Sequence, residues 1–138
     1  MNKVLIIDDE DQLRGLLSRI IGLEGYEVFQ ADSCKNGLKQ LALHDPDVVL
    51  CDVRLPDGNG VELIAEIKRV KPLVEVIMLT AHGNIPDGVR AIKNGAFDYL
   101  TKEDDNNRII PLISRAMDQV AKAKQESQAE IPMDREYS

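Results

Sequence analysis

The chain has 138 residues, of which 43% are hydrophobic and 30% charged, and its formal net charge is −7. This length is enough for one domain with a real core and too short for two. The acidic balance argues against direct binding of nucleic acid, because phosphate contacts need clustered Lys and Arg. No apolar run approaches the roughly 20 residues of a membrane span, so we expect no membrane partner.

The N-terminal stretch and the cysteines indicate the cellular setting. The apolar run in "MNKVLIIDDED" is too short for a signal peptide and is followed at once by acids, so a cytoplasmic location is the default expectation. Cys34 and Cys51 fall on predicted apolar faces. We therefore expect two reduced, buried thiols rather than a disulfide or a metal pair.

Short β-branched runs alternate with segments whose apolar residues recur at helical spacing. The expected strands are Lys3–Ile7, Tyr26–Ala31, Asp47–Cys51, Glu75–Leu79 and Ala96–Leu100. A helix follows each strand. Gly22 and Gly25 close the first helix, and Ser33 is the expected N-cap of the second. The third helix runs from Val61 to Pro72, the fourth ends at Gly95, and the fifth carries an apolar stripe from Ile109 to Val120.

Five strand–helix units predict an α/β fold with a doubly wound, five-stranded parallel sheet covered on both faces. The central strands are continuous apolar runs, as burial on both faces requires. From about Gln125 the chain is polar and aperiodic, so we expect one domain over residues 1–124 and a linker or disordered tail over 125–138. A fifth helix that continues into this segment is the alternative.

Polar residues follow several of the strands, and in such a sheet ligands bind at the carboxyl ends of the strands. These residues are Asp8, Asp9, Glu10 and Asp11 after the first strand, Asp52 after the third, Thr80 after the fourth, and Thr101 and Lys102 after the fifth. Crowded carboxylates repel one another and resist ionisation. Mg²⁺, which prefers oxygen ligands, reduces this repulsion when it binds them. One carboxylate can then attack phosphorus and become an acyl phosphate, with Lys102 and Thr80 donating to the phosphoryl oxygens.

Each of these features also has an ordinary explanation. Carboxylates suit a helix N-terminus, a threonine at a strand end usually bonds locally, and a lysine there is usually solvated. His82 and His44 are more typical of loop residues than of metal or acid–base sites. The joint occurrence of all the acidic and donor groups, each at the end of a strand, favours a site for phosphoryl transfer over these ordinary explanations.

Four motifs, "LIIDDE", "VVLCDVRLPDGNG", "MLTAHG" and "FDYLTK", resemble the receiver domain of bacterial two-component response regulators. The resemblance covers Lys3 to about Lys122. The spacing of "DVRLPDGNG" and "TAHG" is similar to that of receivers that precede enhancer-binding transcription activators of the nitrogen-regulation type. The resemblance implies a flavodoxin-like (βα)5 fold with strand order 2-1-3-4-5 and a sensor histidine kinase as partner.

The resemblance also implies a role for each matching residue. It implies a phosphorylation-dependent switch rather than an enzyme, although such a domain assists its own phosphorylation and dephosphorylation. The changed surface would be the fourth helix, fifth strand and fifth helix, which would control an effector domain or partner, with homodimerisation on phosphorylation. The implied roles are phosphoacceptor for Asp52, direct Mg²⁺ ligands for Asp9, Asp52 and the Arg54 carbonyl, water-mediated metal contact for Asp8, phosphoryl contact for Thr80 and Lys102, and aromatic switch for Tyr99.

One position departs from the family pattern. Receivers usually have proline after the lysine, often with a cis bond, but Glu103 follows Lys102 here. A cis bond costs about 0.5–1 kcal/mol before proline and about 2.5–4 kcal/mol before other residues. We therefore predict a trans Lys102–Glu103 bond, with Asp104 or Asp105 as N-cap of the fifth helix and Lys102 still reaching Asp52.

Other functions remain open from the residues. A flavin-binding, flavodoxin-like module would need an uncharged loop after the first strand, where this chain has "DDED". A magnesium-dependent phosphatase of the haloacid-dehalogenase type would need a second aspartate two residues after its nucleophile, where Arg54 stands. A receiver used only for protein binding is the remaining alternative. An ATPase is not expected, because no Walker-type glycine loop is present.

Overall fold

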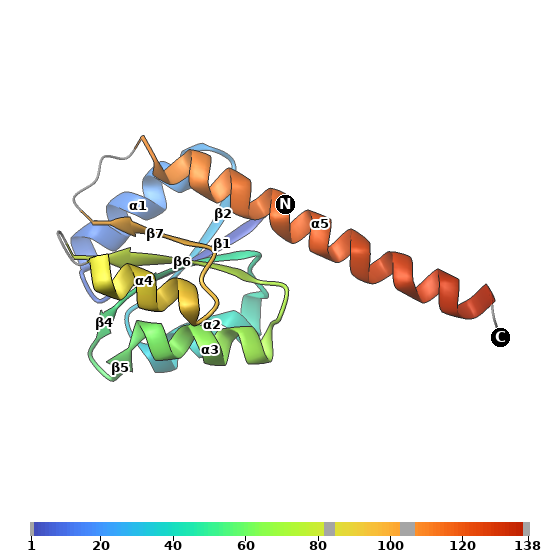
Figure 1. The fold of residues 1–138 in the computed structure, drawn as a ribbon. Helices are drawn as coiled ribbons and strands as arrows, with labels where there is room; N and C mark the ends of the chain where they lie inside the picture. The colour runs from blue at the N-terminus through green and yellow to red at the C-terminus, as the bar shows by residue number, and fades with distance from the viewer. Residues whose placement is uncertain (1, 82–84, 103–106, 137–138) are drawn as a thin grey trace.

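The computed structural model describes residues 2–81, 85–102 and 107–136, with side chains as far as residue 127. A twisted sheet forms its centre (Figure 1). Its strands are β1 (Lys3–Ile7), β2 (Glu27–Ala31), β3 (Val48–Asp52), β6 (Glu75–Thr80) and β7 (Asp98–Thr101). All neighbours pair in parallel in the order β2-β1-β3-β6-β7. Since β6 and β7 are the predicted fourth and fifth strands, this order confirms the predicted flavodoxin-like topology.

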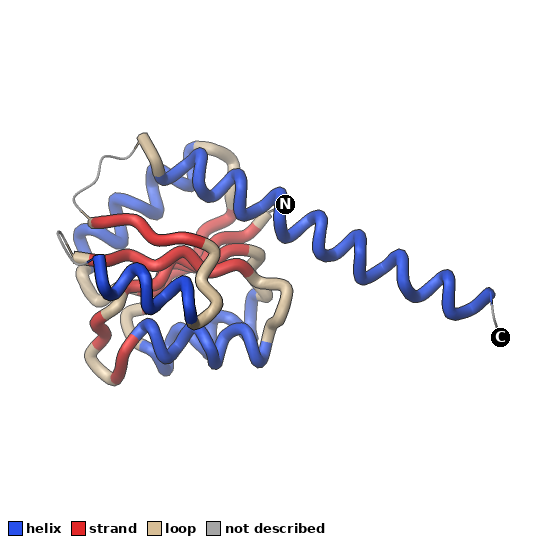
Figure 2. The backbone as a smooth tube through the Cα atoms, in the orientation of Figure 1, coloured by secondary structure: helices blue, strands red, loops and turns tan. Residues whose placement is uncertain are grey.

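Helices cover both faces of the sheet. They are α1 (Asp11–Leu23), α2 (Cys34–His44), α3 (Gly60–Val70), α4 (Ile85–Lys93) and α5 (Ile109–Glu136). Helices α1 and α5 lie on one face, and α2, α3 and α4 lie on the other (Figure 2). The described helices include none with both the length and the apolar character that crossing a membrane demands.

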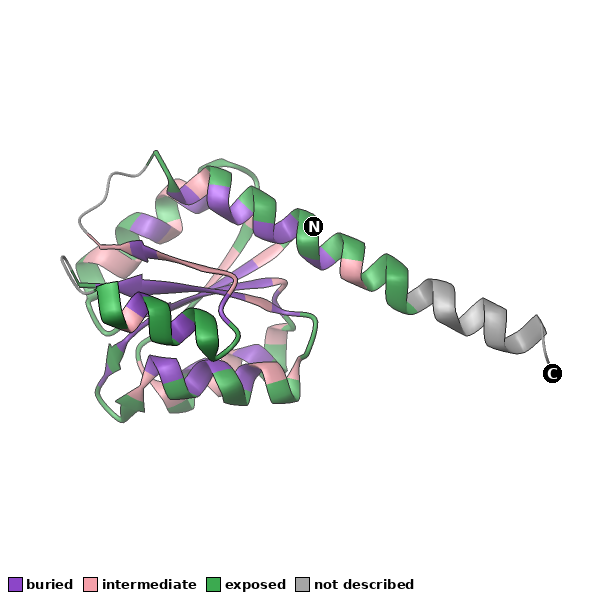
Figure 3. Ribbon diagram, viewed as in Figure 1, coloured by how far each residue is buried: buried purple, intermediate pink, exposed green. Residues whose placement is uncertain are grey.

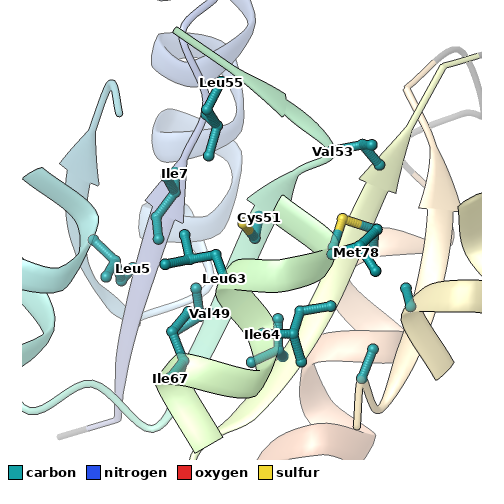
Figure 4. Close-up of a cluster of buried hydrophobic side chains, with 14 of the residues drawn as sticks. Leu5, Ile7, Val49, Cys51, Val53, Leu55, Leu63, Ile64, Ile67 and Met78 are labelled. Carbon is teal, nitrogen blue, oxygen red and sulfur yellow. The ribbon is translucent and has the colours of Figure 1, made fainter. Parts of the chain in front are cut away.

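The core has two layers because alternate strand residues point to opposite faces. Leu5 and Ile7 of β1 belong to the cluster packed against α2 and α3 (Figure 4), whereas Val4 and Ile6 belong to the cluster packed against α1 and α5. All four side chains are fully buried. Two-sided burial explains why the central strands are continuous apolar runs, and it is visible as the purple centre of Figure 3.

Local signals place several element ends where the sequence predicts them. The Ser33 hydroxyl accepts a hydrogen bond from the Asn36 N–H at 3.1 Å, which confirms the predicted N-cap of α2. Strand β1 has the predicted range, and the other four strands of the sheet differ from theirs by one or two residues at one or both ends. The most relevant difference is that Asp52 is itself the last residue of β3.

A short hairpin follows Asp52, where the sequence suggests only a loop. It consists of β4 (Arg54–Leu55) and β5 (Gly58–Asn59), which pair antiparallel. The chain then enters α3 at Gly60, whose N–H donates to the Val53 carbonyl at 2.7 Å. A Cβ atom at residue 60 would overlap the Asp52 carbonyl oxygen, so glycine is required at this position.

Helix α5 packs on the sheet through its first half and then extends beyond the sheet and the other helices (Figure 1). Its inner side buries residues such as Ile113 and Val120. The Lys124 ammonium donates to Asp47 at 2.9 Å near the point where the helix leaves the sheet. The backbone remains helical to Glu136, and a domain boundary after residue 124 stays a prediction.

Candidate functional site

The carboxyl ends of three strands bring Asp8, Asp52 and Lys102 together. Asp8 follows β1, Asp52 ends β3, and Lys102 follows β7. The Lys102 ammonium lies 2.9 Å from Asp52 Oδ2 and 3.4 Å from Asp8 Oδ2. Both aspartates are buried, with 0% of Asp8 and 5% of Asp52 exposed. The predicted convergence of acids and an ammonium at this edge is therefore present in the structure.

Glu10 is a third carboxylate in this cluster. It accepts a hydrogen bond from Lys102 Nζ at 2.8 Å, and its backbone N–H donates to Asp8 Oδ1 at 2.9 Å. Asp8, Glu10 and Asp52 each offer an oxygen within 4.8 Å of the others. Asp9, which the resemblance makes a metal ligand, is exposed and lies outside this group of three.

Burial dominates the electrostatics of Asp8. The pKa of Asp8 is raised to about 6, chiefly by desolvation and also by the Asp52 charge, against the lowering effects of the Glu10 N–H and of Lys102. Although burial acts to lower the pKa of Lys102, its hydrogen bonds to Glu10 and Asp52 raise that pKa well above the usual value. The cluster therefore holds more negative charge than the single ammonium neutralises.

The donor set fits a hard divalent cation. Asp8 Oδ2 is buried, and its contact with the Lys102 ammonium at 3.4 Å is an ion pair without hydrogen-bond geometry, so this oxygen retains a lone pair for a further partner. Three carboxylates at this spacing, with space for water, are the oxygen-rich surroundings that Mg²⁺ prefers. A cavity of about 150 Å³ adjoins them; its lining residues are Glu10, Asp52, Val53, Arg54, Ala81, Asp87 and Lys102.

The two expected switch residues, Thr80 and Tyr99, are not among the residues that line this cavity. The buried Thr80 hydroxyl donates to the Leu100 carbonyl at 3.3 Å, so it is bonded to β7. Tyr99 is half-buried on β7, and its ring lies against Gly88 of α4. A Cβ atom at Gly88 of α4 would lie only 2.5 Å from Tyr99 Cδ2. The absence of a side chain at residue 88 therefore makes room for the ring.

The remaining candidates from the sequence have ordinary environments or lie outside the described residues. His44 stacks on Phe29 with ring centroids 3.8 Å apart, at the end of α2. Cys34 and Cys51 are both free thiols, half-buried and buried respectively. The candidates outside the described residues are His82, Glu103, Asp104 and Asp105, together with the Lys102–Glu103 bond.

Arg14 supports the acidic loop, and the sequence motifs do not indicate this role. Its guanidinium donates to the Asp8 carbonyl at 2.7 Å and to the Asp11 carboxylate at 2.8 Å. It also donates to the Gln30 amide oxygen on β2 at 3.0 Å. The spacing from Asp11 to Arg14, one helical turn, is the signal that could have identified part of this arrangement.

Comparison with known proteins identifies the family. The family model of the response regulator receiver domain matches residues 4–114. The transcriptional regulatory protein GlrR of Escherichia coli K12 is 41% identical over 123 residues, which is 89% of this chain and 28% of GlrR. The crystal structure of NtrX from Brucella abortus superposes with a TM-score of 0.86 at 31% identity, over 94% of this chain and 30% of that chain. The solution structure of the beryllofluoride-activated NtrC4 receiver domain dimer gives a TM-score of 0.81 at 35% identity, over 87% and 99% of the two chains.

The chain belongs to the response regulator receiver domain family of two-component systems. It is therefore a signalling domain, and its relatives include enhancer-binding regulators of the NtrC and NtrX type. It spans about a quarter of the length of the curated relatives that it matches. The family match selects the receiver over the flavin-binding and phosphatase alternatives.

Proposed function

We propose that this domain is a phosphorylation-dependent switch in which Asp52 accepts a phosphoryl group from a sensor histidine kinase. One observation carries the proposal: the buried Asp52 carboxylate, at the end of a central strand, lies 2.9 Å from the Lys102 ammonium beside an open cavity. A rigid strand end holds the nucleophile in place, and the cavity admits the phosphoryl donor.

The reaction requires one bond to form and one to break. An Asp52 carboxylate oxygen attacks phosphorus, and the bond from phosphorus to the kinase imidazole nitrogen breaks, with the electron pair returning to that nitrogen. Lys102 is placed to pair with a phosphoryl oxygen as negative charge moves into the pocket.

Mg²⁺ is the cation that this family uses, and it would neutralise the carboxylates and the incoming phosphoryl oxygens. We assign its direct ligands to Asp9, Asp52 and the Arg54 carbonyl, and a water-mediated contact to Asp8. Two observations support a cation here: the unused lone pair of Asp8 Oδ2 and the close spacing of the carboxylates. Glu10 lies in the same cluster and would hold Lys102 while the metal binds.

The output surface is α4, β7 and α5. For the Thr80 hydroxyl to reach a phosphoryl group, it must leave the Leu100 carbonyl, and the Tyr99 ring then turns inward. A phosphoryl group shifts this equilibrium only as far as it prefers the rearranged state. Helix α4 already exposes three large apolar side chains, namely Ile85, Val89 and Ile92.

Homodimerisation through this surface is the proposed consequence of phosphorylation. The similar NtrC4 receiver is a dimer in its beryllofluoride-activated form. Because the matched relatives are transcription regulators about four times longer than the matched segment, we assign this switch to the control of an effector in transcription.

Intact-mass spectrometry tests the proposal. The protein is incubated with phosphoramidate, a small phosphodonor, with and without Mg²⁺. We expect the mass of one phosphoryl group to appear in the presence of Mg²⁺ and to be absent from Asp52→Asn. Asp118→Asn, an exposed change on α5, should label like the unsubstituted protein. Equal labelling of Asp52→Asn would refute the assignment.

A further inference from the structure

The tip of the hairpin after Asp52 binds the N-terminus of α2. Asp57 Oδ1 accepts a hydrogen bond from the Cys34 N–H at 2.7 Å, and Asp57 Oδ2 accepts one from the Lys35 N–H at 3.0 Å. These partners are 23 and 22 residues away in sequence. A helix start leaves four N–H groups without helical partners. Asp57 thus satisfies two of them from another part of the fold.

A third free N–H group at the start of α2 is satisfied locally. The Ser33 hydroxyl accepts from the Asn36 N–H at 3.1 Å, and the Ser33 carbonyl accepts the first ordinary helical bond, from the Gly37 N–H at 2.8 Å. The cap of α2 is therefore shared between a local residue and the hairpin. Loss of Asp57 would leave two N–H groups at the helix start without these bonds.

Charge and packing both tighten this contact. A carboxylate is favoured at the positive end of a helix dipole. The N–H groups of Lys35 and Cys34 lower the pKa of Asp57, so it stays ionised at neutral pH. At the next residue, a Cβ atom on Gly58 would lie 3.1 Å from Cys34 Sγ, which shows how closely the hairpin approaches α2.

The opposite end of the hairpin reaches the acidic cavity. Arg54 of β4 pairs with Asn59 of β5, lines the cavity beside Asp52, and directs its N–H toward Asp52 Oδ1 at 3.4 Å. Each strand has only two residues, and an isolated hairpin of this size is not stable in water. External contacts must therefore fix its position.

We propose that Asp57 is a positioning residue, whose bonds to the start of α2 hold the hairpin so that the Arg54 backbone stays at the acidic cavity. This inference rests on the proposed function, since it assigns to Asp57 an effect on the proposed cation site. Asp57 itself touches neither the carboxylates nor the phosphoryl group. Substitution of Asp57 should therefore change the affinity for the cation and not the maximal rate of phosphorylation at saturating cation.

The test uses Mg²⁺ alone, titrated into the ¹⁵N-labelled protein and followed by backbone amide shifts. We expect Asp57→Ala to weaken Mg²⁺ binding about tenfold, as typically follows loss of an outer-shell partner. The Mg²⁺ affinity of Asp57→Asn, which keeps one carbonyl acceptor but no charge, should lie between that of Asp57→Ala and that of the unsubstituted protein. The matched control is Asp32→Ala: Asp32 also lies beside the start of α2, but it bonds to the Asn36 side chain at 2.6 Å. It should leave Mg²⁺ affinity unchanged.

Two further readouts separate positioning from general damage. Without metal, the Cys34 and Lys35 amides should exchange faster with solvent in Asp57→Ala, while amides in β1 and β3 should not. With phosphoramidate, the Mg²⁺ concentration at half-maximal rate should rise while the maximal rate at saturating Mg²⁺ is retained. If Asp57→Ala does not fold, Asp57→Asn carries the same comparison.

Two results would overturn the inference. The first is a folded Asp57 variant whose Mg²⁺ affinity lies within twofold of the unsubstituted protein. The second is a maximal rate that falls at saturating Mg²⁺ with an unchanged half-maximal concentration. Failure of the proposed function looks different, since the unsubstituted protein would then show no Mg²⁺-dependent labelling at Asp52, and both proposals would fall together.

Discussion

The Lys102 ammonium lies 2.9 Å from the Asp52 carboxylate and serves as the internal cation of the acidic cluster. It also contacts Glu10 at 2.8 Å and Asp8 at 3.4 Å. One positive charge thus faces three carboxylates, of which Asp8 and Asp52 are buried and Glu10 is exposed. Any divalent cation that enters must share these carboxylates with Lys102, which links metal affinity to the position of the lysine.

We expect Lys102→Met to bind Mg²⁺ more tightly, by about tenfold, because removal of a like charge favours a second cation. The same variant should be phosphorylated more slowly, because a phosphoryl oxygen loses its partner. Lys124→Met is the matched control, since Lys124 pairs with Asp47, which precedes β3 at the amino ends of the strands. Calorimetric Mg²⁺ titration checks the affinities, and weaker binding by Lys102→Met would contradict the account.

Asp8 makes the stability of the fold depend on pH. Its folded-state pKa of about 6 lies above the ordinary value of 3.8, so between these values the folded state binds more protons than the unfolded state. The free energy of unfolding should therefore fall as pH rises from about 4 to 6, by at most about 3 kcal/mol.

Urea unfolding of the unsubstituted protein and of Asp8→Asn at pH 4.5 and 7 measures this contribution. The variant should lose less stability between the two pH values, because its side chain does not titrate. Mg²⁺ at pH 7 should restore stability to the unsubstituted protein by binding the folded state. Parallel pH profiles for the two proteins would show that Asp8 is not held at a raised pKa.

Two glycines should respond in opposite directions to alanine. A methyl group at residue 60 overlaps the Asp52 carbonyl oxygen, so Gly60→Ala should destabilise the protein by about 3 kcal/mol through displacement of the loop after Asp52. Gly15 lies inside α1 with open space around it, so Gly15→Ala should stabilise by up to about 1 kcal/mol. Thermal unfolding compares them, and a neutral Gly60→Ala would contradict the described hairpin geometry.

Gly88 should control the position of the Tyr99 ring. Because a Cβ atom at residue 88 would meet that ring, Gly88→Ala should displace it from α4. Nuclear Overhauser contacts between the Tyr99 ring and α4 should weaken or disappear in this variant. Gly22→Ala, where the added methyl group meets nothing within 4 Å, should preserve them. Retained contacts in Gly88→Ala would mean that the ring does not pack as described.

The sheet and the acidic edge could be predicted because both depend on patterns that the sequence displays directly. Buried strands such as Val48–Asp52 are apolar runs, and residues after parallel strands must meet at one edge. Which carboxylates turn inward could not be predicted in this way. Glu10 and Asp9 occupy neighbouring positions, and the conformation of the β1–α1 loop decides which one meets Lys102.

The hairpin and its contact with α2 could not be predicted for a different reason. Two-residue strands are too short to show an alternating pattern, and "LPDGNG" has the composition of a loop. The bonds from Asp57 to Cys34 and Lys35 join segments more than 20 residues apart. No local period encodes such a cap, so only the assembled fold reveals it.

Reductive trapping of the phosphorylated residue tests the central claim most directly. Borohydride reduces an aspartyl phosphate to homoserine, which peptide mass spectrometry can locate after labelling with phosphoramidate and Mg²⁺. We expect homoserine at position 52, only when Mg²⁺ and the phosphodonor are both present. Homoserine at another aspartate, or phosphorylated protein without homoserine at position 52, would contradict the assignment of Asp52 as phosphoacceptor.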